Sequence, residues 1–257
     1  MKKIALITGV TSGIGKATAL KLAQSNFNLI ITGRRKNLLE ELKKELGIKY
    51  KCDVLSLNFD VRNNKEVDKA VDSLPESWKK IDVLVNNAGL AVGMNPIQSG
   101  EIDDWEQMID TNIKGLLYIT RKIAPLMIEN GHGHIINLSS IAGKDVYENG
   151  NVYCATKQAV EALSKGMRID LLKHNIKVTN IAPGMVDTEF SLVRFKGDQV
   201  KASNVYEGLV PLLAEDIADA ILFVVTRPPH VNINDMLIMP TAQANGFVAH
   251  RDVNKHK

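Results

Sequence analysis

The sequence predicts a doubly wound α/β fold, and two observations indicate this class. Short apolar runs alternate along the chain with longer segments whose apolar residues recur three and four positions apart, which is helical spacing. The apolar runs lack polar alternation, as is typical of parallel strands that are buried on both faces. In such a fold, helices cover both faces of the sheet and ligands bind at the carboxyl ends of the strands.

The expected elements follow one another without a break. Strands are expected at Ile4–Thr8, Asn28–Thr32, Val54–Phe59, Val83–Asn86, His134–Leu138, Lys177–Ile181 and Met236–Met239. Helices are expected at Ile14–Gln24, Lys36–Leu46, Asn64–Ser73, Asp103–Ile128, Val152–Lys173 and Glu215–Thr226. Because the alternation continues throughout the chain, we expect one domain over residues 1–257.

Composition and charge argue against several classes of protein. Of the 257 residues, 45% are hydrophobic and 24% charged, as in an ordinary globular domain. The formal net charge is only +3 and basic residues are mixed with acids, so nucleic acid is not an expected partner. Cys52 and Cys154 lack metal-ligand spacing and fit a reducing cytosol, so no metal is expected. No window suits a signal peptide or a membrane span, so we expect a cytoplasmic protein without a membrane partner.

The first expected strand ends in a glycine-rich turn that predicts nucleotide binding. Gly9, Gly13 and Gly15 follow the strand and stand at the start of a helix. Because glycine has no side chain, a pyrophosphate can approach the backbone closely at the helix N-terminus. The spacing matches neither the G-x-G-x-x-G fingerprint nor the phosphate loop of NTPases, and a plain glycine-rich turn is the alternative. The loop residues expected to contact the cofactor are Gly9, Thr11, Ser12, Gly13, Ile14 and Gly15.

Two arginines end the second expected strand and favour NADP over NAD. Where NAD-binding folds place an acidic residue about 20 residues beyond the glycines, this chain has Arg34 and Arg35. Guanidinium groups pair well with a 2′-phosphate. Either arginine could instead be a solvated surface charge, although a cation is mildly unfavourable at the start of a helix.

Turn-forming residues also follow the third and fourth expected strands. Asp60 and Val61 come after the third strand, and Asn87, Ala88 and Gly89 come after the fourth. Ordinary loop chemistry accounts for such residues. At strand carboxyl ends they are equally suited to line the adenine side of a dinucleotide.

Tyr153 and Lys157 form a candidate acid/base pair. They lie four residues apart on the face of an expected helix that otherwise turns inward. A tyrosine pKa near 10 is roughly three units, or about 4 kcal/mol, too high for proton exchange at neutral pH. One cation at ~4 Å in an effective dielectric of ~20 supplies roughly that much. The alternative is a chance pair, in which the lysine reaches solvent and the tyrosine packs.

Two other strand-end or buried groups join this candidate site. Asn112 falls on the apolar face of the long expected helix, so its amide needs a backbone group, a water or Lys157 as partner. The fifth expected strand opens into Ser139 and Ser140, which place hydroxyls at a strand end.

Together these motifs resemble the short-chain dehydrogenase/reductase family over essentially the whole chain. The residues that carry the resemblance are Thr8–Gly15, Asn86–Gly89, Asn112, Ser140, Tyr153-x-x-x-Lys157 and Pro183-Gly184, in the family's order. The resemblance implies a Rossmann-type, seven-stranded parallel sheet with helices on both faces and an NAD(P) cofactor. It also implies a homotetramer, formed through the two longest helices.

The resemblance implies a role for each site residue. Tyr153 is the proton donor or acceptor, and Ser140, rather than Ser139, positions the substrate oxygen. Lys157 binds the nicotinamide ribose and lowers the pKa of Tyr153, and Asn112 holds a water in a proton relay. Cofactor contacts are further implied for Tyr153, Lys157, Pro183, Gly184, Val186 and Thr188.

A narrower resemblance concerns a subgroup of NADP-dependent 3-hydroxy acid dehydrogenases. The similar segments are Leu74–Trp78, Asn86–Met94, Glu189–Asp198 and His230–Asn234. The subgroup oxidises serine, allo-threonine and related 3-hydroxy acids, or reduces malonic semialdehyde. The alternatives are a reductase of 3-oxoacyl or other ketones, and a regulatory NADPH-binding protein without turnover. The complete Ser140–Tyr153–Lys157 set weighs against the regulatory protein.

The segment at about 185–213 is expected to form a substrate lid, because it follows the sixth strand at the nicotinamide end of the fold. Arg194 lies in it between two apolar residues. If Arg194 faces the pocket, its fork could bind the substrate carboxylate. The alternative is a surface ion pair with Glu189 or Asp198.

Overall fold

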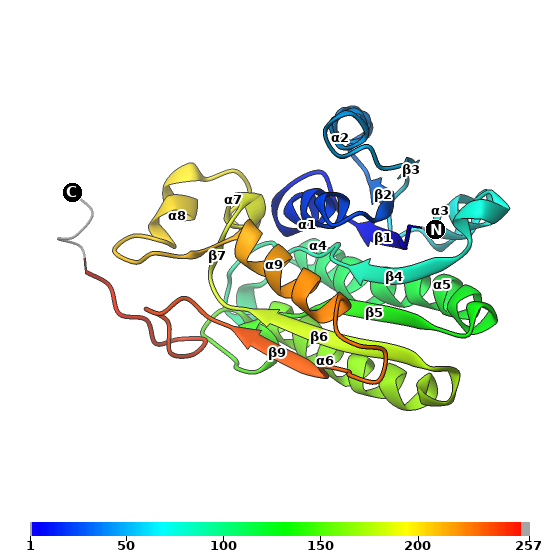
Figure 1. Ribbon diagram of the computed structural model, residues 1–257. Coiled ribbons are helices and arrows are strands. Elements are labelled where there is room, and N and C mark those ends of the chain that lie inside the picture. Colours follow the sequence, from blue (N-terminus) through cyan, green and yellow to red (C-terminus); the bar gives the residue numbers. More distant parts are fainter. Residues whose placement is uncertain (1, 253–257) are drawn as a thin grey trace.

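The computed structural model describes residues 2–252 and contains a seven-stranded parallel sheet between two layers of helices (Figure 1). The strands are β1 (Ile4–Thr8), β2 (Asn28–Gly33), β3 (Val54–Asn58), β4 (Ile81–Asn86), β5 (Gly133–Leu138), β6 (Ile176–Pro183) and β9 (Asp235–Ile238). Their order across the sheet is β3-β2-β1-β4-β5-β6-β9, and every pairing is parallel. The predicted fold class is confirmed.

The order of the strands reverses at β1, because β2 and β4 flank it on opposite sides. The connections that leave β1 and β4 therefore run to opposite faces of the sheet and open a crevice at the carboxyl ends of these strands. Doubly wound folds bind their ligands in this crevice.

The helices form one layer on each face of the sheet. The longer helices are α1 (Gly13–Gln24), α2 (Lys36–Tyr50), α3 (Asn64–Asp72), α4 (Ile102–Ile109), α5 (Leu116–Asn130), α6 (Asn151–Asp170) and α9 (Ala214–Val225). The apolar faces of α1, α2 and α9 share one core with the sheet, and those of α3 and α5 share the other. Within β1, Ala5 and Ile7 face the first core, whereas Ile4 and Leu6 face the second. Both faces are thus buried, which explains why the strand sequences show no polar alternation.

The long helix expected at Asp103–Ile128 is present, but its winding is not α-helical throughout. A π-helical segment, Asp110–Gly115, separates α4 from α5. A π turn inserts an extra residue into the helix, and such turns occur frequently at functional sites. Here it carries Asn112, whose side chain is buried and bonded to the loop that follows β4. Spacing of apolar residues cannot reveal such a local change in winding.

The segment expected to be a lid contains four short elements. They are β7 (Val186–Asp187), α7 (Glu189–Arg194), α8 (Gln199–Asn204) and β8 (Leu212–Leu213), and β7 pairs with β8 in a parallel ribbon. Figure 1 shows α7 and α8 beyond the carboxyl edge of the sheet, next to α9 and the start of α1. Elsewhere the element boundaries differ little from the prediction, the largest change being four further residues in α2.

None of the helices in residues 2–252 is long and apolar enough to cross a membrane.

Candidate active site

Tyr153 and Ser140 lie together at the carboxyl edge of the sheet. Tyr153 stands in the first turn of α6, is 7% exposed and packs its ring 5.7 Å from that of Phe190. Ser140 follows β5 and accepts a hydrogen bond from the backbone N–H of Ala142 (3.1 Å). Ser139 instead is buried and donates to the carbonyl of Lys157 (3.3 Å). Of the two serines, Ser140 hydrogen-bonds the phenol, in agreement with the family resemblance.

The protein environment raises the pKa of Tyr153. Burial raises the pKa, and the neighbouring Tyr147 raises it further. A hydrogen bond with Ser140 and the charge of Arg194 lower it, without reversing the direction. Desolvation disfavours the phenolate more than these two groups favour it.

Lys157 lies near the ring of Tyr153 and is bonded to the backbone at the end of β5. Its ammonium lies 5.9 Å from the centre of the Tyr153 ring and donates to the carbonyl of Leu138 (2.8 Å). Burial lowers the pKa of Lys157 itself to about 8. The main influences on the pKa of Tyr153 are burial, Tyr147, Ser140 and Arg194, so the net direction is upward and the expected lowering by Lys157 stays a prediction.

Asn112 fastens the loop after β4 to α6. Its Oδ1 accepts from the N–H of Leu90 (2.8 Å), and its Nδ2 donates to the carbonyl of Leu90 (2.8 Å) and to the hydroxyl of Thr156 (3.0 Å). A Cβ at Gly89 would come within 3.2 Å of Asn112 Oδ1 and 3.4 Å of Lys157 Nζ. We expected a backbone group, a water or Lys157 as the partner of Asn112, and the structure shows a backbone group. Both N–H groups of the amide already donate hydrogen bonds, to Leu90 and Thr156.

The glycine-rich loop brings α1 close to the end of β4. Gly9 and Gly13 have positive φ values of 71° and 52°, which side chains disfavour. A Cβ at Gly15 would collide with the carbonyl oxygen of Gly9 and the side-chain amide of Asn87. Ser12, the N-cap residue, makes no side-chain capping bond, and the first turn of α1 has no acidic residue. Free N–H groups at a helix N-terminus suit a pyrophosphate, so the loop fits a dinucleotide.

Polar contacts join this loop to the end of β4. Asn87 Nδ2 donates to the carbonyls of Thr8 (2.8 Å) and Gly9 (3.0 Å). The hydroxyl of Thr8 accepts from the backbone N–H groups of Asn87 (3.1 Å) and Ala88 (2.9 Å). Ile14 turns inward and packs against the core. Asn87 therefore helps to hold the glycine-rich loop in place, which an ordinary turn residue would not do.

Arg34 and Arg35 both lie at the end of β2, near the glycine-rich loop. Arg35 donates from Nε to the hydroxyl of Thr11 (3.0 Å) and from Nη1 to Glu189 at the start of α7 (3.0 Å). Arg34 is more exposed and lies 3.6 Å from Asp60. Two cations beside the loop suit a 2′-phosphate, and the contact between Arg35 and Glu189 was not foreseen from the sequence.

Asp60 and Val61 occupy the strand end next to Arg34. Burial raises the pKa of Asp60, but hydrogen bonds and charge from Arg62 outweigh it and hold the pKa below its usual range. Asp60 thus stays ionised and fixes Arg62 through contacts of 2.6–3.1 Å. Val61 is buried in the core, and a Cβ at Gly115 would come within 2.8 Å of its side chain.

Pro183 ends β6, and the chain then turns toward the glycine-rich loop. The N–H of Gly184 donates to the carbonyl of Ile238 (2.7 Å). Val186 lies in β7, and the hydroxyl of Thr188 caps α7 by accepting from the N–H of Phe190 (3.3 Å). A Cβ at Gly13 would meet Thr188 at 3.3 Å, so the start of α7 lies against the glycine-rich loop.

Arg194 ends α7, and its guanidinium lies against the rings of two tyrosines. Its guanidinium carbon lies 5.5 Å from the centre of the Tyr153 ring and 5.3 Å from that of Tyr147. Neither predicted surface pair is present, because Glu189 pairs with Arg35 and Asp198 with Lys201 (3.4 Å). Sequence reasoning missed Tyr147, whose hydroxyl accepts from Arg194 (3.0 Å). Tyr147 lies in a loop without periodicity, so no pattern pointed to it.

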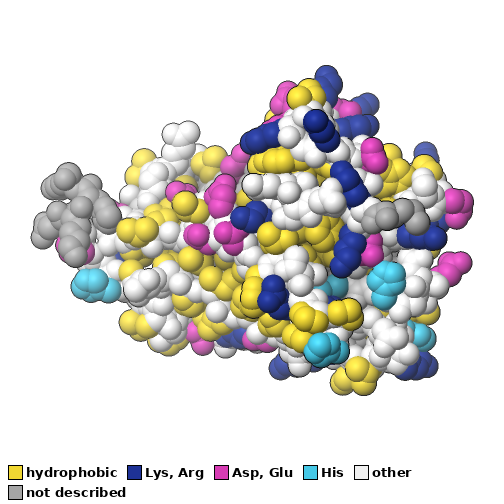
Figure 2. Space-filling model, viewed as in Figure 1, with side chains coloured by type: hydrophobic (Ala, Val, Ile, Leu, Met, Phe, Trp, Pro, Cys, Tyr) yellow, Lys and Arg dark blue, Asp and Glu magenta, His cyan; other side chains and the backbone are white. Residues whose placement is uncertain are grey.

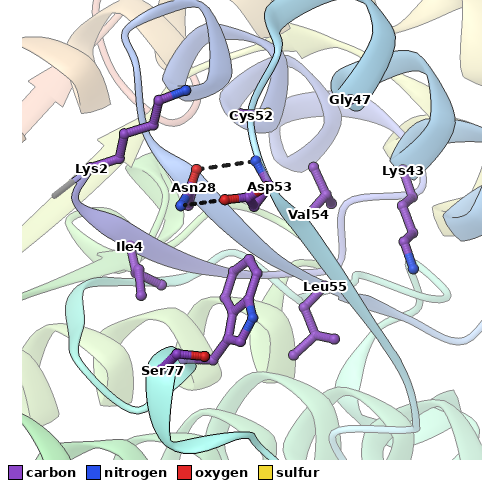
Figure 3. A pocket seen from close by; sticks show the side chains of 11 residues that line it. Lys2, Ile4, Asn28, Lys43, Gly47, Cys52, Asp53, Val54, Leu55 and Ser77 are labelled. Carbon is purple, nitrogen blue, oxygen red and sulfur yellow. Dashed lines mark hydrogen bonds between the residues drawn. The ribbon is translucent and has the colours of Figure 1, made fainter.

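The opposite end of the sheet also has a hollow, which none of the predicted site residues lines. It measures about 820 Å³ and lies at the amino ends of β1, β2 and β3, where Asn28 and Asp53 hydrogen-bond to each other (Figure 3). Ligands of this fold class bind at the carboxyl ends of the strands instead.

On the face shown in Figure 2, basic and acidic side chains are interspersed, with several of both kinds over α2.

A family model for short chain dehydrogenases matches residues 3–198. Over 250 residues the chain is 48% identical to the NADP-dependent 3-hydroxy acid dehydrogenase YdfG of Escherichia coli O6:H1, covering 96% of this chain and 99% of that protein. It is also 44% identical to sulfoacetaldehyde reductase 2 of Chromohalobacter salexigens, over 98% of this chain and 100% of the relative.

A solved structure of similar fold is the closed form of a serine dehydrogenase complexed with NADP+. The two chains superpose with a TM-score of 0.91 at 47% sequence identity, covering 96% of this chain and 99% of the other. An archaeal alcohol dehydrogenase from Thermococcus sibiricus matches with a TM-score of 0.85 at 24% identity, which shows the fold alone.

Proposed function

The chain belongs to the short-chain dehydrogenase family, and on that premise we propose that it is an NADP-dependent 3-hydroxy acid dehydrogenase. It transfers a hydride between the nicotinamide and the 3-hydroxyl carbon of a small 3-hydroxy acid of the serine, allo-threonine or 3-hydroxypropionate type. The observation that carries the proposal is the placement of Ser140, Tyr153 and Lys157 at one edge of the sheet, next to the glycine-rich loop and the two arginines after β2.

The cofactor, when bound, supplies the hydride acceptor or donor. The glycine-rich loop and α1 hold its pyrophosphate, and Arg34 and Arg35 bind its 2′-phosphate. The strand ends after β3, β4 and β6 line the rest of the crevice, including Asp60, Val61, Asn87, Ala88, Gly89, Pro183, Gly184, Val186 and Thr188.

The chain's own residues move the proton. Ser140 hydrogen-bonds the substrate oxygen, and Tyr153 takes the hydroxyl proton in oxidation or returns it in reduction. Lys157 keeps positive charge near the phenol at neutral pH, since its pKa is about 8, and binds the cofactor ribose. Asn112 holds the loop after β4, and only the second lone pair of its Oδ1 is left in its side chain to bind a relay water.

The proposal includes one domain with a lid at about 185–213 and a cytoplasmic homotetramer. Family resemblance supports the assembly and the location, and light scattering of the purified protein measures the assembly directly.

The central experiment follows NADPH formation across a panel of 3-hydroxy acids, with 2-hydroxy acids of the same size as controls. We expect turnover of the 3-hydroxy acids with NADP and little with the controls. Turnover of acyl thioesters but not of free acids would contradict the assignment and favour a 3-oxoacyl reductase. Tight NADPH binding without turnover of any substrate would favour a regulatory protein.

A further inference from the structure

Arg194 carries a positive charge beside Tyr153 that no acidic residue of the described chain balances. Within residues 2–252, no carboxylate forms an ion pair with it. Its Nε is buried without a hydrogen-bond partner, and its Nη2 donates to a neutral hydroxyl, that of Tyr147. The residue is half-buried, and a charge that is partly removed from water is costly unless it is paired. The arrangement is therefore suited to receive an anion from outside the chain.

The nearby acids are each occupied by a different cation. Glu189 pairs with Arg35 (3.0 Å), and Asp198 pairs with Lys201 (3.4 Å). Asp104, whose side chain is 6% exposed, pairs with Lys196 (2.9 Å). None of these three acids is therefore left to pair with Arg194.

Three contacts hold Arg194 in place. The backbone carbonyl of Arg194 accepts a hydrogen bond from the N–H of Gly93 (3.0 Å). Two residues further along the chain, Lys196 forms an ion pair with Asp104 in α4. The ring and hydroxyl of Tyr147 hold the guanidinium itself. Because these contacts hold both the backbone and the side chain of Arg194, the guanidinium has a fixed position relative to Tyr153, 5.5 Å from the centre of its ring. A fixed cation next to the acid/base group selects substrates by the separation between their acid group and their hydroxyl.

We infer that Arg194, positioned by Tyr147, binds the carboxylate of the substrate and so selects small hydroxy acids over neutral alcohols. The inference rests on the proposed function and names the residue that recognises its substrate class. The guanidinium offers parallel N–H groups to the two oxygens of a carboxylate. Tyr147 is a positioning residue: its hydroxyl fixes one edge of the guanidinium and leaves other N–H groups for the substrate.

Kinetics with a charged and a neutral substrate test the role of Arg194. Arg194→Met should reduce kcat/KM for 3-hydroxypropionate about 10- to 100-fold, the value of a charge-assisted contact, and change kcat/KM for its methyl ester less than about 3-fold. Lys201→Met, which removes one positive charge from the same lid, should leave both values near those of the wild type. Equal losses on acid and ester in Arg194→Met would overturn the inference.

A double-mutant cycle tests the positioning role of Tyr147. Tyr147→Phe keeps the ring and removes the hydroxyl, so KM for the acid should rise severalfold while kcat stays similar. In the Arg194→Met background the same change should have no further effect, because the residue acts through Arg194. An equal effect of Tyr147→Phe in both backgrounds would refute its positioning role.

A binding measurement separates this inference from the proposed function. Propionate has the carboxylate but no hydroxyl, so it should bind the NADPH complex of the wild type and change NADPH fluorescence without turnover. Arg194→Met should lose this response while NADPH affinity and melting temperature stay unchanged. If wild type and variant respond equally, or neither responds, Arg194 does not bind the acid group. If propionate binds only the wild type but no hydroxy acid turns over, the proposed function fails and the anion site stands.

Discussion

Protonation of one buried histidine is expected to destabilise the protein in mild acid. His134 lies in β5 with 4% of its surface exposed, and its Nε2 shares a hydrogen bond with the hydroxyl of Thr179 (2.8 Å). Its Nδ1 is buried without a partner. Burial, with smaller contributions from Lys177 and Lys3, lowers the pKa of His134 from 6.5 to about 3. The folded protein therefore keeps this imidazole neutral at pH values where the unfolded chain protonates it.

The sign and size of the effect follow from proton linkage. A depressed pKa gives stability that is present above pH 6.5 and lost as the pH falls toward 3. With these two pKa values, lowering the pH from 7 to 5 should reduce the free energy of unfolding by about 2 kcal/mol through His134 alone. The loss approaches its full value only near the folded pKa.

Urea denaturation at pH 7 and pH 5 measures this difference. Other groups titrate in the same range, so the quantity to compare is the pH-dependent loss in the wild type minus that in His134→Gln. Glutamine keeps a hydrogen-bonding group near Thr179 but does not titrate. His230→Gln, at an exposed position, should keep the full loss of the wild type. An equal pH dependence in wild type and His134→Gln would refute the reasoning.

Three further predictions concern catalysis and cofactor binding. Tyr153→Phe should keep the fold and NADPH affinity but reduce kcat about 10²–10⁴-fold, because only the proton-transferring group is lost; near wild-type turnover would contradict this. Replacing Arg34 and Arg35 with Ala should raise KM for NADP about 10- to 100-fold and leave KM for NAD nearly unchanged, and equal kcat/KM for both cofactors in the wild type would argue against the assignment. Gly15→Ala should weaken NADPH binding in fluorescence titrations, since its Cβ collides with Gly9 and Asn87, and wild-type affinity would show that the loop can shift without cost.

The strands, the covering helices and the glycine-rich loop could be predicted from the sequence because each rests on a local signal. Apolar runs without alternation gave the strands, and Gly13 and Gly15 opened α1 where a helix was expected. The choice of Ser140 rather than Ser139 came from the family resemblance, because the residues alone indicated only that two adjacent hydroxyls lie at a strand end. These inferences needed neither the path of the loops nor the packing between distant segments.

The remaining features depend on contacts between distant parts of the chain. The π turn at Asn112 arises where a side chain bonds to the backbone of Leu90, 22 residues away. Tyr147 becomes part of the site only because α7 folds over it. The upward direction of the Tyr153 pKa was not foreseen, because the (i, i+4) spacing of Tyr153 and Lys157 does not show how deeply the phenol is buried.

The short helix α7 connects the choice of cofactor with the choice of substrate. Glu189 in its first turn accepts a hydrogen bond from Arg35, and Phe190 packs on Tyr153. At the end of the helix, the guanidinium of Arg194 lies 5.5 Å from the centre of the Tyr153 ring. Redesigning the enzyme for NAD by replacing Arg35 would remove the partner of Glu189 and release this end of the helix. Any resulting shift would reach Phe190 and Arg194 within two turns. Cofactor exchange in this protein is therefore expected to require a compensating change at Glu189, or substrate selectivity will change with it.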